Sequence, residues 1–210
     1  EALELAESEE NPSDGLKRSI NVSLNSIGNL YSILKQYDIA IAQFKKSMAL
    51  EKELGNKLGL AINYQNIGEC LEYKGELEEA LHYYRTSLDY NNEIDSDKGR
   101  VICKNSIAQI YIKQNKLTQA LDILEPNLLA AETLGDMSII AAININIGWA
   151  LMELKQYAES EKYLVTGLEM SKKHHLPSYI AHAYNYLSKL HTYKGDYKNA
   201  LEYYQMAEAF

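Results

Sequence analysis

The hydrophobic positions of the chain follow a helical spacing. Leu24, Ile27 and Tyr31 lie three and four residues apart, so they share one face of a helix that we predict over residues 17–34. A second stripe of the same kind predicts another helix over residues 38–54. Because no segment alternates hydrophobic and polar residues over the length of a strand, the pattern predicts an all-α fold.

The same stripes return about every 40 residues, a period typical of solenoid repeats. The recurring apolar position is occupied by Ile27, Ile67, Ile107, Ile147 and Leu187. The residue after it is always small: Gly28, Gly68, Ala108, Gly148 and Ser188. A further small residue recurs in the second helix: Ala40, Ala80, Ala120, Ser160 and Ala200. This register predicts one array of five helix pairs, over residues 17–54, 57–94, 97–134, 137–174 and 177–210.

The small residues have a steric reason. A glycine inside a helix costs about 1 kcal/mol relative to alanine. Close approach of the two helices of a pair can offset that cost, because no bulky side chain then stands between them. We therefore predict tight packing of the second helix against Gly28, Gly68 and Gly148.

These residues resemble the tetratricopeptide repeat family. Its pattern has an apolar residue followed by a small one, a tyrosine such as Tyr31, an alanine such as Ala40 and an aromatic residue such as Phe44. The resemblance covers nearly the whole chain, with a remnant of a preceding repeat at residues 1–13. The long repeat is similar to that of G-protein signalling modulators, kinesin light chains and bacterial regulators. It implies a right-handed superhelical solenoid of antiparallel helix pairs, whose first helices line a concave, peptide-binding face.

The first-helix positions that face away from the second helix are rich in carboxamides. In the family, asparagines at such positions hold the ligand main chain, and the resemblance extends that role to Asn25, Asn29, Asn66, Asn105 and Asn185. The alternative is a solvated polar wall, or carboxamides that cap neighbouring helices. The predicted partner-binding residues are Asn25, Asn29, Gln65, Asn66, Glu69, Asn105, Gln109, Ile145, Trp149, Asn185 and Lys189.

Two of these residues permit a second interpretation. Trp149, the one tryptophan, suits a binding hot spot but equally suits packing between helices. Glu69, one turn before Glu72, suits a basic ligand residue or a solvated acidic face. Five first helices at about 9–10 Å separation span about 40 Å. An extended partner of about 12 residues would fill that length at about 3.3 Å per residue.

Composition and residue spacing argue against several classes of function. The net charge of −8 argues against nucleic acid as a partner. Cys70 and Cys103 lie at different repeat positions, so we expect buried free thiols. No segment has the length of apolar sequence that a membrane helix requires. The five histidines lack metal-ligand spacing, and neither a nucleophile–base pair nor a phosphate-binding glycine loop is apparent, so we predict no catalysis, no cofactor and no metal.

The sequence favours a protein- or peptide-binding scaffold, the sensing or docking region of a larger signalling protein. We interpret the chain as a piece of a longer protein, because it begins inside a predicted helix and ends at Phe210 without a cap. The alternative is the regulatory segment of a peptide-controlled phosphatase, sensor kinase or transcription regulator. Homo-oligomers through the terminal helices are a further possibility. We expect a cytoplasmic location, with the periplasm as the alternative.

Overall fold

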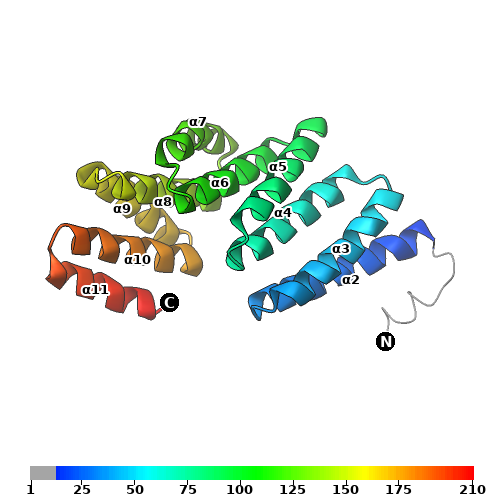
Figure 1. Ribbon diagram of the computed structural model, residues 1–210, viewed down its shortest axis with the longest axis horizontal. Helices are drawn as coiled ribbons and strands as arrows, with labels where there is room; N and C mark the ends of the chain where they lie inside the picture. The colour runs from blue at the N-terminus through cyan, green and yellow to red at the C-terminus, as the bar shows by residue number, and fades with distance from the viewer. Residues whose placement is uncertain (1–12) are drawn as a thin grey trace. The chain divides into compact units, whose positions relative to one another are not determined.

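The computed structural model describes residues 13–210, and these form ten α-helices without a strand (Figure 1). The predicted all-α fold is confirmed; the predicted remnant at residues 1–13 lies, apart from Ser13, outside the described residues. The helices are α2 (Asp14–Ile33), α3 (Tyr37–Glu53), α4 (Lys57–Tyr73), α5 (Leu77–Glu93), α6 (Asp97–Lys113), α7 (Leu117–Leu134), α8 (Met137–Glu153), α9 (Tyr157–Lys173), α10 (Pro177–Tyr193) and α11 (Tyr197–Glu208).

Each connection between helices contains one residue with a left-handed backbone. These residues are Lys35, Gly55, Gly75, Asp95, Asn115, Gly135, Lys155, His175 and Gly195. In most of these connections the next residue donates its N–H to a carbonyl in the last turn of the preceding helix, as Asn56 does to Glu51 at 3.0 Å. Glycine adopts this conformation without strain, whereas a lysine does not. The sequence indicated only the glycine connections.

Close packing within the helix pairs explains the small residues of the repeat. A Cβ atom added to Gly28 would lie 2.6 Å from the ring of Phe44. The same atom on Gly68 would lie 2.7 Å from the ring of Tyr84, and on Gly148 it would lie 2.6 Å from Leu164. The predicted approach of the second helix to these glycines is therefore confirmed.

The chain divides into two compact units, Glu1–Cys103 and Lys104–Phe210. In the N-terminal unit, α2 packs against α3, α3 against α4, and α4 against α5. In the C-terminal unit, α7 packs against α8, and the pairs α8–α9 and α10–α11 meet along α8, α9 and α10. None of the helices in residues 13–210 combines the length and apolar character needed to cross a membrane.

Candidate functional site

Two clefts open along the first helices of the N-terminal unit. The first cleft, of about 690 Å³, lies between α2, the end of α3 and α4. Its lining residues are Arg18, Asn21, Val22, Asn25, Ser26, Asn29, Glu51, Leu54, Asn56, Ile62 and Asn66. The second cleft, of about 400 Å³, is lined by Leu58, Ala61, Ile62, Gln65, Asn66, Glu69, Ser87, Asn91, Ser96, Lys98, Gly99, Ile102 and Cys103. Because both clefts include Ile62 and Asn66, we treat them together as the N-terminal groove.

The groove brings together the five partner-binding residues that were predicted in this unit: Asn25, Asn29, Gln65, Asn66 and Glu69. Asn29 is exposed and Asn66 is half-buried, so both present polar atoms at the groove surface. Asn66 stands where the two clefts meet and, with Ile62, lines both of them.

Asn25 is partly committed to the protein itself. Its side-chain amide donates to Ser47 Oγ at 2.9 Å and to the backbone carbonyl of Asn21 at 3.1 Å. Ser47 Oγ also accepts from Asn63 Nδ2 at 3.2 Å. The amide nitrogen of Asn25 therefore ties α2 to α3, while its carbonyl oxygen is buried without a partner.

Glu69 has the environment of a carboxylate set into the wall of a groove. The side chain is exposed, yet burial raises the pKa of its carboxyl, with the nearby charge of Glu72 adding to this. The hydrogen bond from Gln65 Nε2, 3.2 Å from Glu69 Oε1, opposes the shift. These effects coexist because groove walls surround the carboxylate while its tip still contacts water.

The two cysteines are buried free thiols, as predicted. Cys103 Sγ lies 3.2 Å from Ser87 Oγ, to which the thiol donates, and 3.6 Å from Gln65 Oε1. Burial raises the pKa of the Cys103 thiol, and its hydrogen bonds with Ser87 and Asn91 oppose that rise. A thiol with a raised pKa is a poor nucleophile at neutral pH, so Cys103 supports the wall of the second cleft.

In the C-terminal unit, carboxamides at the same repeat positions bond to one another. Asn146 Nδ2 donates to Asn105 Oδ1 at 2.8 Å, and Gln109 Nε2 donates to Asn146 Oδ1 at 3.5 Å. Asn146 is buried, so its amide joins α6 to α8 inside the protein. Asn185 is exposed on α10, apart from this network.

The remaining predicted residues of this unit also pack against neighbours. Trp149 stacks on Tyr186 with ring centroids 5.0 Å apart, which is the packing role considered for it from the sequence. Lys189 Nζ lies 2.6 Å from a carboxylate oxygen of Glu153. Ile145 belongs to the hydrophobic core and is 3% exposed, so the prediction that it lines a binding surface is wrong. Its side chain packs at Gly167, where an added Cβ would lie 2.6 Å from it.

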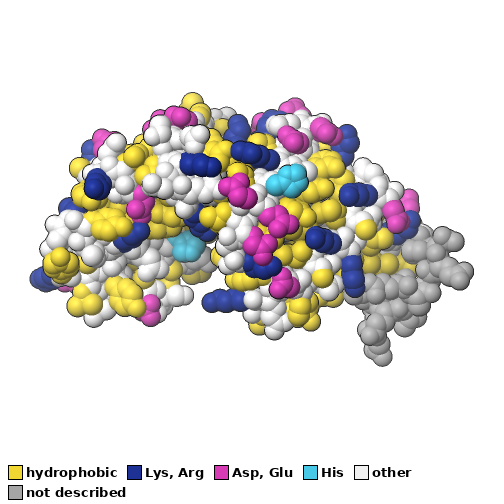
Figure 2. Space-filling model, viewed as in Figure 1, with side chains coloured by type: hydrophobic (Ala, Val, Ile, Leu, Met, Phe, Trp, Pro, Cys, Tyr) yellow, Lys and Arg dark blue, Asp and Glu magenta, His cyan; other side chains and the backbone are white. Residues whose placement is uncertain are grey.

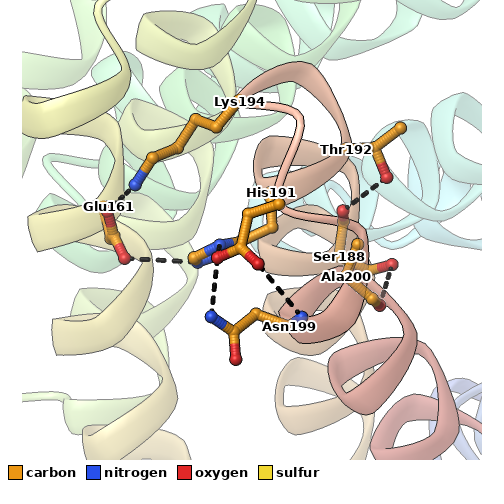
Figure 3. Close-up of polar contacts among 8 residues, drawn as sticks. Glu161, Ser188, His191, Thr192, Lys194, Asn199 and Ala200 are labelled. Atoms are coloured by element: carbon orange, nitrogen blue, oxygen red, sulfur yellow. Dashed lines mark hydrogen bonds and ion pairs between the residues drawn. The ribbon is translucent and has the colours of Figure 1, made fainter.

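A polar cluster at the junction of α9, α10 and α11 is structural (Figure 3). His191 is buried, with Nδ1 3.0 Å from Asp196 Oδ2 and Nε2 3.2 Å from Glu161 Oε1. Lys194 Nζ lies 2.8 Å from Glu161 Oε2, and this contact is the main cause of the lowered pKa of the Glu161 carboxyl. Among residues 13–210, no group of three His, Cys, Asp or Glu side chains is arranged to hold a metal ion.

The second helices also contribute to the groove, which was not predicted from the sequence. Glu51 and Asn91, near the ends of α3 and α5, line the first and second clefts respectively. Each lies against a glycine of the next helix: an added Cβ would come within 2.2 Å of the Glu51 carboxyl at Gly59 and within 1.8 Å of the Asn91 amide at Gly99. A polar residue paired with a glycine at equal spacing in two repeats was the available signal.

Comparison with known proteins agrees with this fold. A sequence model described as tetratricopeptide repeat matches residues 19–93 and 138–210. The Tonsoku-like protein of Drosophila melanogaster is 23% identical over 221 residues, with 93% of this chain and 15% of that protein covered. Protein KINESIN LIGHT CHAIN-RELATED 2 of Arabidopsis thaliana is 28% identical over 145 residues, with 64% and 21% covered. The chain thus spans about a fifth or less of these relatives.

Solved structures with the same fold include two Rap proteins. A Rap protein complexed with Competence and Sporulation Factor has a TM-score of 0.81 and 22% identity, with 97% of this chain and 56% of that chain covered. The Rap conjugation gene regulator of plasmid pLS20, in complex with the Phr* peptide, has a TM-score of 0.76 and 16% identity, with 86% and 50% covered. The family match extends over most of the sequence, and the helix pairs have the packing that its motif requires. The chain belongs to the tetratricopeptide repeat family.

Proposed function

We propose that the N-terminal groove binds an extended segment of a partner protein or a peptide. The observation that carries the proposal is the pair of adjoining clefts with Asn66 at their junction. Asn29 and Asn66 offer both donors and acceptors at the groove surface, and a peptide main chain needs both. Such contacts would hold a segment whatever its side chains are.

The size of the groove limits the segment. Three first helices, α2, α4 and α6, at about 9–10 Å separation span about 20 Å. An extended segment of about six residues fills that length. The ligand of about 12 residues expected from the sequence would need the first helices of the C-terminal unit as well, where the carboxamides already bond to one another.

The charge distribution favours a protein partner over nucleic acid. The chain has a net charge of −8. On the face shown in Figure 2, basic side chains are interspersed with acidic and apolar ones rather than gathered into one field. Nucleic-acid binding generally uses a continuous basic surface.

The finer proposal is that this groove is the sensing or docking region of a cytoplasmic signalling or regulatory protein, without catalytic activity of its own. Its support is the fold shared with a Rap conjugation gene regulator that is described in complex with a peptide. Oligomers through the terminal helices remain a separate proposal, which sedimentation over a range of concentrations tests.

The test is a screen of 12-residue peptides against the chain of residues 1–210. For any peptide that binds, we expect Asn66→Ala and Asn29→Ala to weaken the affinity at least tenfold. Asn185→Ala is the matched control, because it removes an exposed first-helix asparagine from the C-terminal unit. If the Asn66 and Asn29 variants bind as tightly as the native chain, the groove is not the site.

A further inference from the structure

Most of the buried side-chain polar atoms that lack a hydrogen-bond partner in residues 13–210 gather around the first cleft. They are Asn21 Nδ2 and Oδ1, Asn25 Oδ1, Asn63 Oδ1 and Glu51 Oε2. Asn21, Asn25 and Glu51 line the cleft itself. A buried polar atom without a partner destabilises the folded protein. Such a concentration beside an open cleft indicates that something from outside supplies the missing partners.

The unpartnered atoms are mainly acceptors. The orientation of the Asn25 amide follows from its environment, because its nitrogen donates to the backbone carbonyl of Asn21, which can only accept. The unpartnered atom of Asn25 is therefore its carbonyl oxygen, an acceptor. Together with Glu51 Oε2 and Asn21 Oδ1, this gives three acceptors that a single group rich in N–H donors could satisfy.

The carboxylate of Glu51 favours a positively charged group in the first cleft. The residue is 7% exposed, and its carboxyl packs against Gly59. Nearby lysines are already paired, Lys17 with Glu53 at 3.0 Å and Lys57 with Glu93 at 2.8 Å. Arg18 also lines the cleft, but its side chain is exposed. It makes no hydrogen bond to Glu51 Oε2. A buried carboxylate without a cation is costly, so a cationic group from a ligand is the complementary occupant.

In the next repeat, the polar residue at the equivalent position has its hydrogen-bond partners within the protein. Asn91 occupies the place of Glu51 and lies against Gly99 as Glu51 lies against Gly59. Its amide donates to the backbone carbonyl of Ser87 at 2.9 Å and lies 3.5 Å from Cys103 Sγ. The amide in the second repeat thus has its partners within the protein, whereas Glu51 Oε2 in the first repeat is buried without one, and its side chain lines the cleft.

We propose that the first cleft is a subsite for the guanidinium group of an arginine in the bound segment, with Glu51 as its charge partner and the carbonyl oxygens of Asn21 and Asn25 as further acceptors. A guanidinium spreads five N–H donors over a planar fork and can therefore reach three separate oxygens at once, whereas the three donors of an ammonium all radiate from one nitrogen. This inference rests on the proposed function and names the side-chain chemistry that the N-terminal groove selects.

The test uses N-acetyl-arginine methylamide as the probe and the side-chain amide NMR signals of Asn21 and Asn25 as the readout. We expect saturable shifts with the arginine probe and none with the citrulline analogue, which has the same shape without the charge. Glu51→Gln should weaken probe binding at least tenfold. Glu53→Gln is the matched control on the same helix, because Glu53 is exposed and pairs with Lys17.

Three outcomes overturn the inference: no saturable shift, which would mean that water alone fills the cleft; equal shifts with citrulline; or unchanged binding by Glu51→Gln. Should that variant fold poorly, Glu51→Asn provides the same test with the residue that the second repeat already carries at this place. Because the probe has no extended main chain, its result is independent of the peptide screen. Peptides that bind without a preference for arginine overturn this inference alone, whereas probe binding without peptide binding overturns the proposed function.

Discussion

The two units carry the same row of first-helix positions, yet they use it differently. In the N-terminal unit, Asn29 and Asn66 face an open groove. In the C-terminal unit, Asn105 and Gln109 bond to Asn146. A repeated carboxamide is therefore available to a ligand only where the neighbouring repeat leaves it without a partner.

The reason lies in one position of the repeat. Asn66 and Asn146 occupy the same place in α4 and α8, but Asn146 is buried while Asn66 is half-buried. The buried residue must find hydrogen-bond partners within the protein, because leaving it unpaired would cost about 1–3 kcal/mol. The half-buried residue can exchange water for a ligand at little cost.

The largest effects should come from what both units share. Gly68→Val and Gly148→Val would each force a side chain into a fully buried neighbour, Tyr84 and Leu164 respectively. We expect each to lower the free energy of unfolding by about 3 kcal/mol, measured in urea. Gly15→Val is the control, since an added Cβ at Gly15 would lie 4.0 Å from Ser13 Oγ, an ordinary contact distance. A loss in one unit alone would show that the pairs are not packed alike.

The difference between the bonded carboxamides of the C-terminal unit and the open ones of the N-terminal unit should appear in their contributions to stability. Asn105→Ala removes the acceptor of the buried Asn146 amide, and we expect it to lower the free energy of unfolding by about 1–2 kcal/mol. Asn29→Ala removes an exposed amide, and the change should stay within about 0.5 kcal/mol. Urea unfolding of the two variants measures both. Equal losses would contradict the division into an open row and a bonded row.

A smaller effect, an increase in the free energy of unfolding, is expected at the connections between helices. Lys35 and Lys155, one in each unit, have φ values of 59° and 63°. A non-glycine residue in this left-handed region costs about 1 kcal/mol, so Lys35→Gly and Lys155→Gly should each raise the free energy of unfolding by about that amount. Gly75→Ala, at φ 82°, should lower it similarly. Thermal or urea unfolding that shows no gain at either lysine would indicate that these connections are not strained.

The smallest effect is a difference in pH dependence. The lowered pKa of Glu161 means that its contribution to stability is present above its unfolded pKa and is lost as the pH falls through its folded pKa. Glu69 has a raised pKa, so its burial cost is present above the folded pKa and is relieved as the pH falls through that value. The two units should therefore respond to acid in opposite directions around these residues.

Urea unfolding over roughly pH 3 to 7 measures this difference. Glu161→Gln should reduce the loss of stability that occurs as the pH falls. Glu69→Gln should remove the gain of stability that protonation of Glu69 provides. Glu132→Gln, an exposed residue of α7, is the control. Parallel pH profiles for Glu161→Gln and Glu69→Gln would contradict the opposite environments of the two carboxylates.

The helix pairs and their close contacts could be predicted because they depend on spacing along the chain. The apolar residue, the small residue after it and the alanine of the second helix meet whenever two helices of this length pack in an antiparallel pair. Burial of hydrophobic side chains on one face then drives the pairing. The left-handed connections at Lys35 and Lys155 could not be predicted, because the helices they join impose that backbone on residues that do not favour it.

By itself, the sequence determined the repeat, the all-α fold and the wall on which the carboxamides lie. The tertiary structure alone decided which carboxamides are available: it paired Asn105 with Asn146, buried Ile145 in the core and stacked Trp149 on Tyr186. It also left Glu51 Oε2 buried without a hydrogen-bond partner beside a cleft. The physical reason is that hydrogen-bond partners and burial come from residues far apart in the chain, whereas helical periodicity is a property of near neighbours.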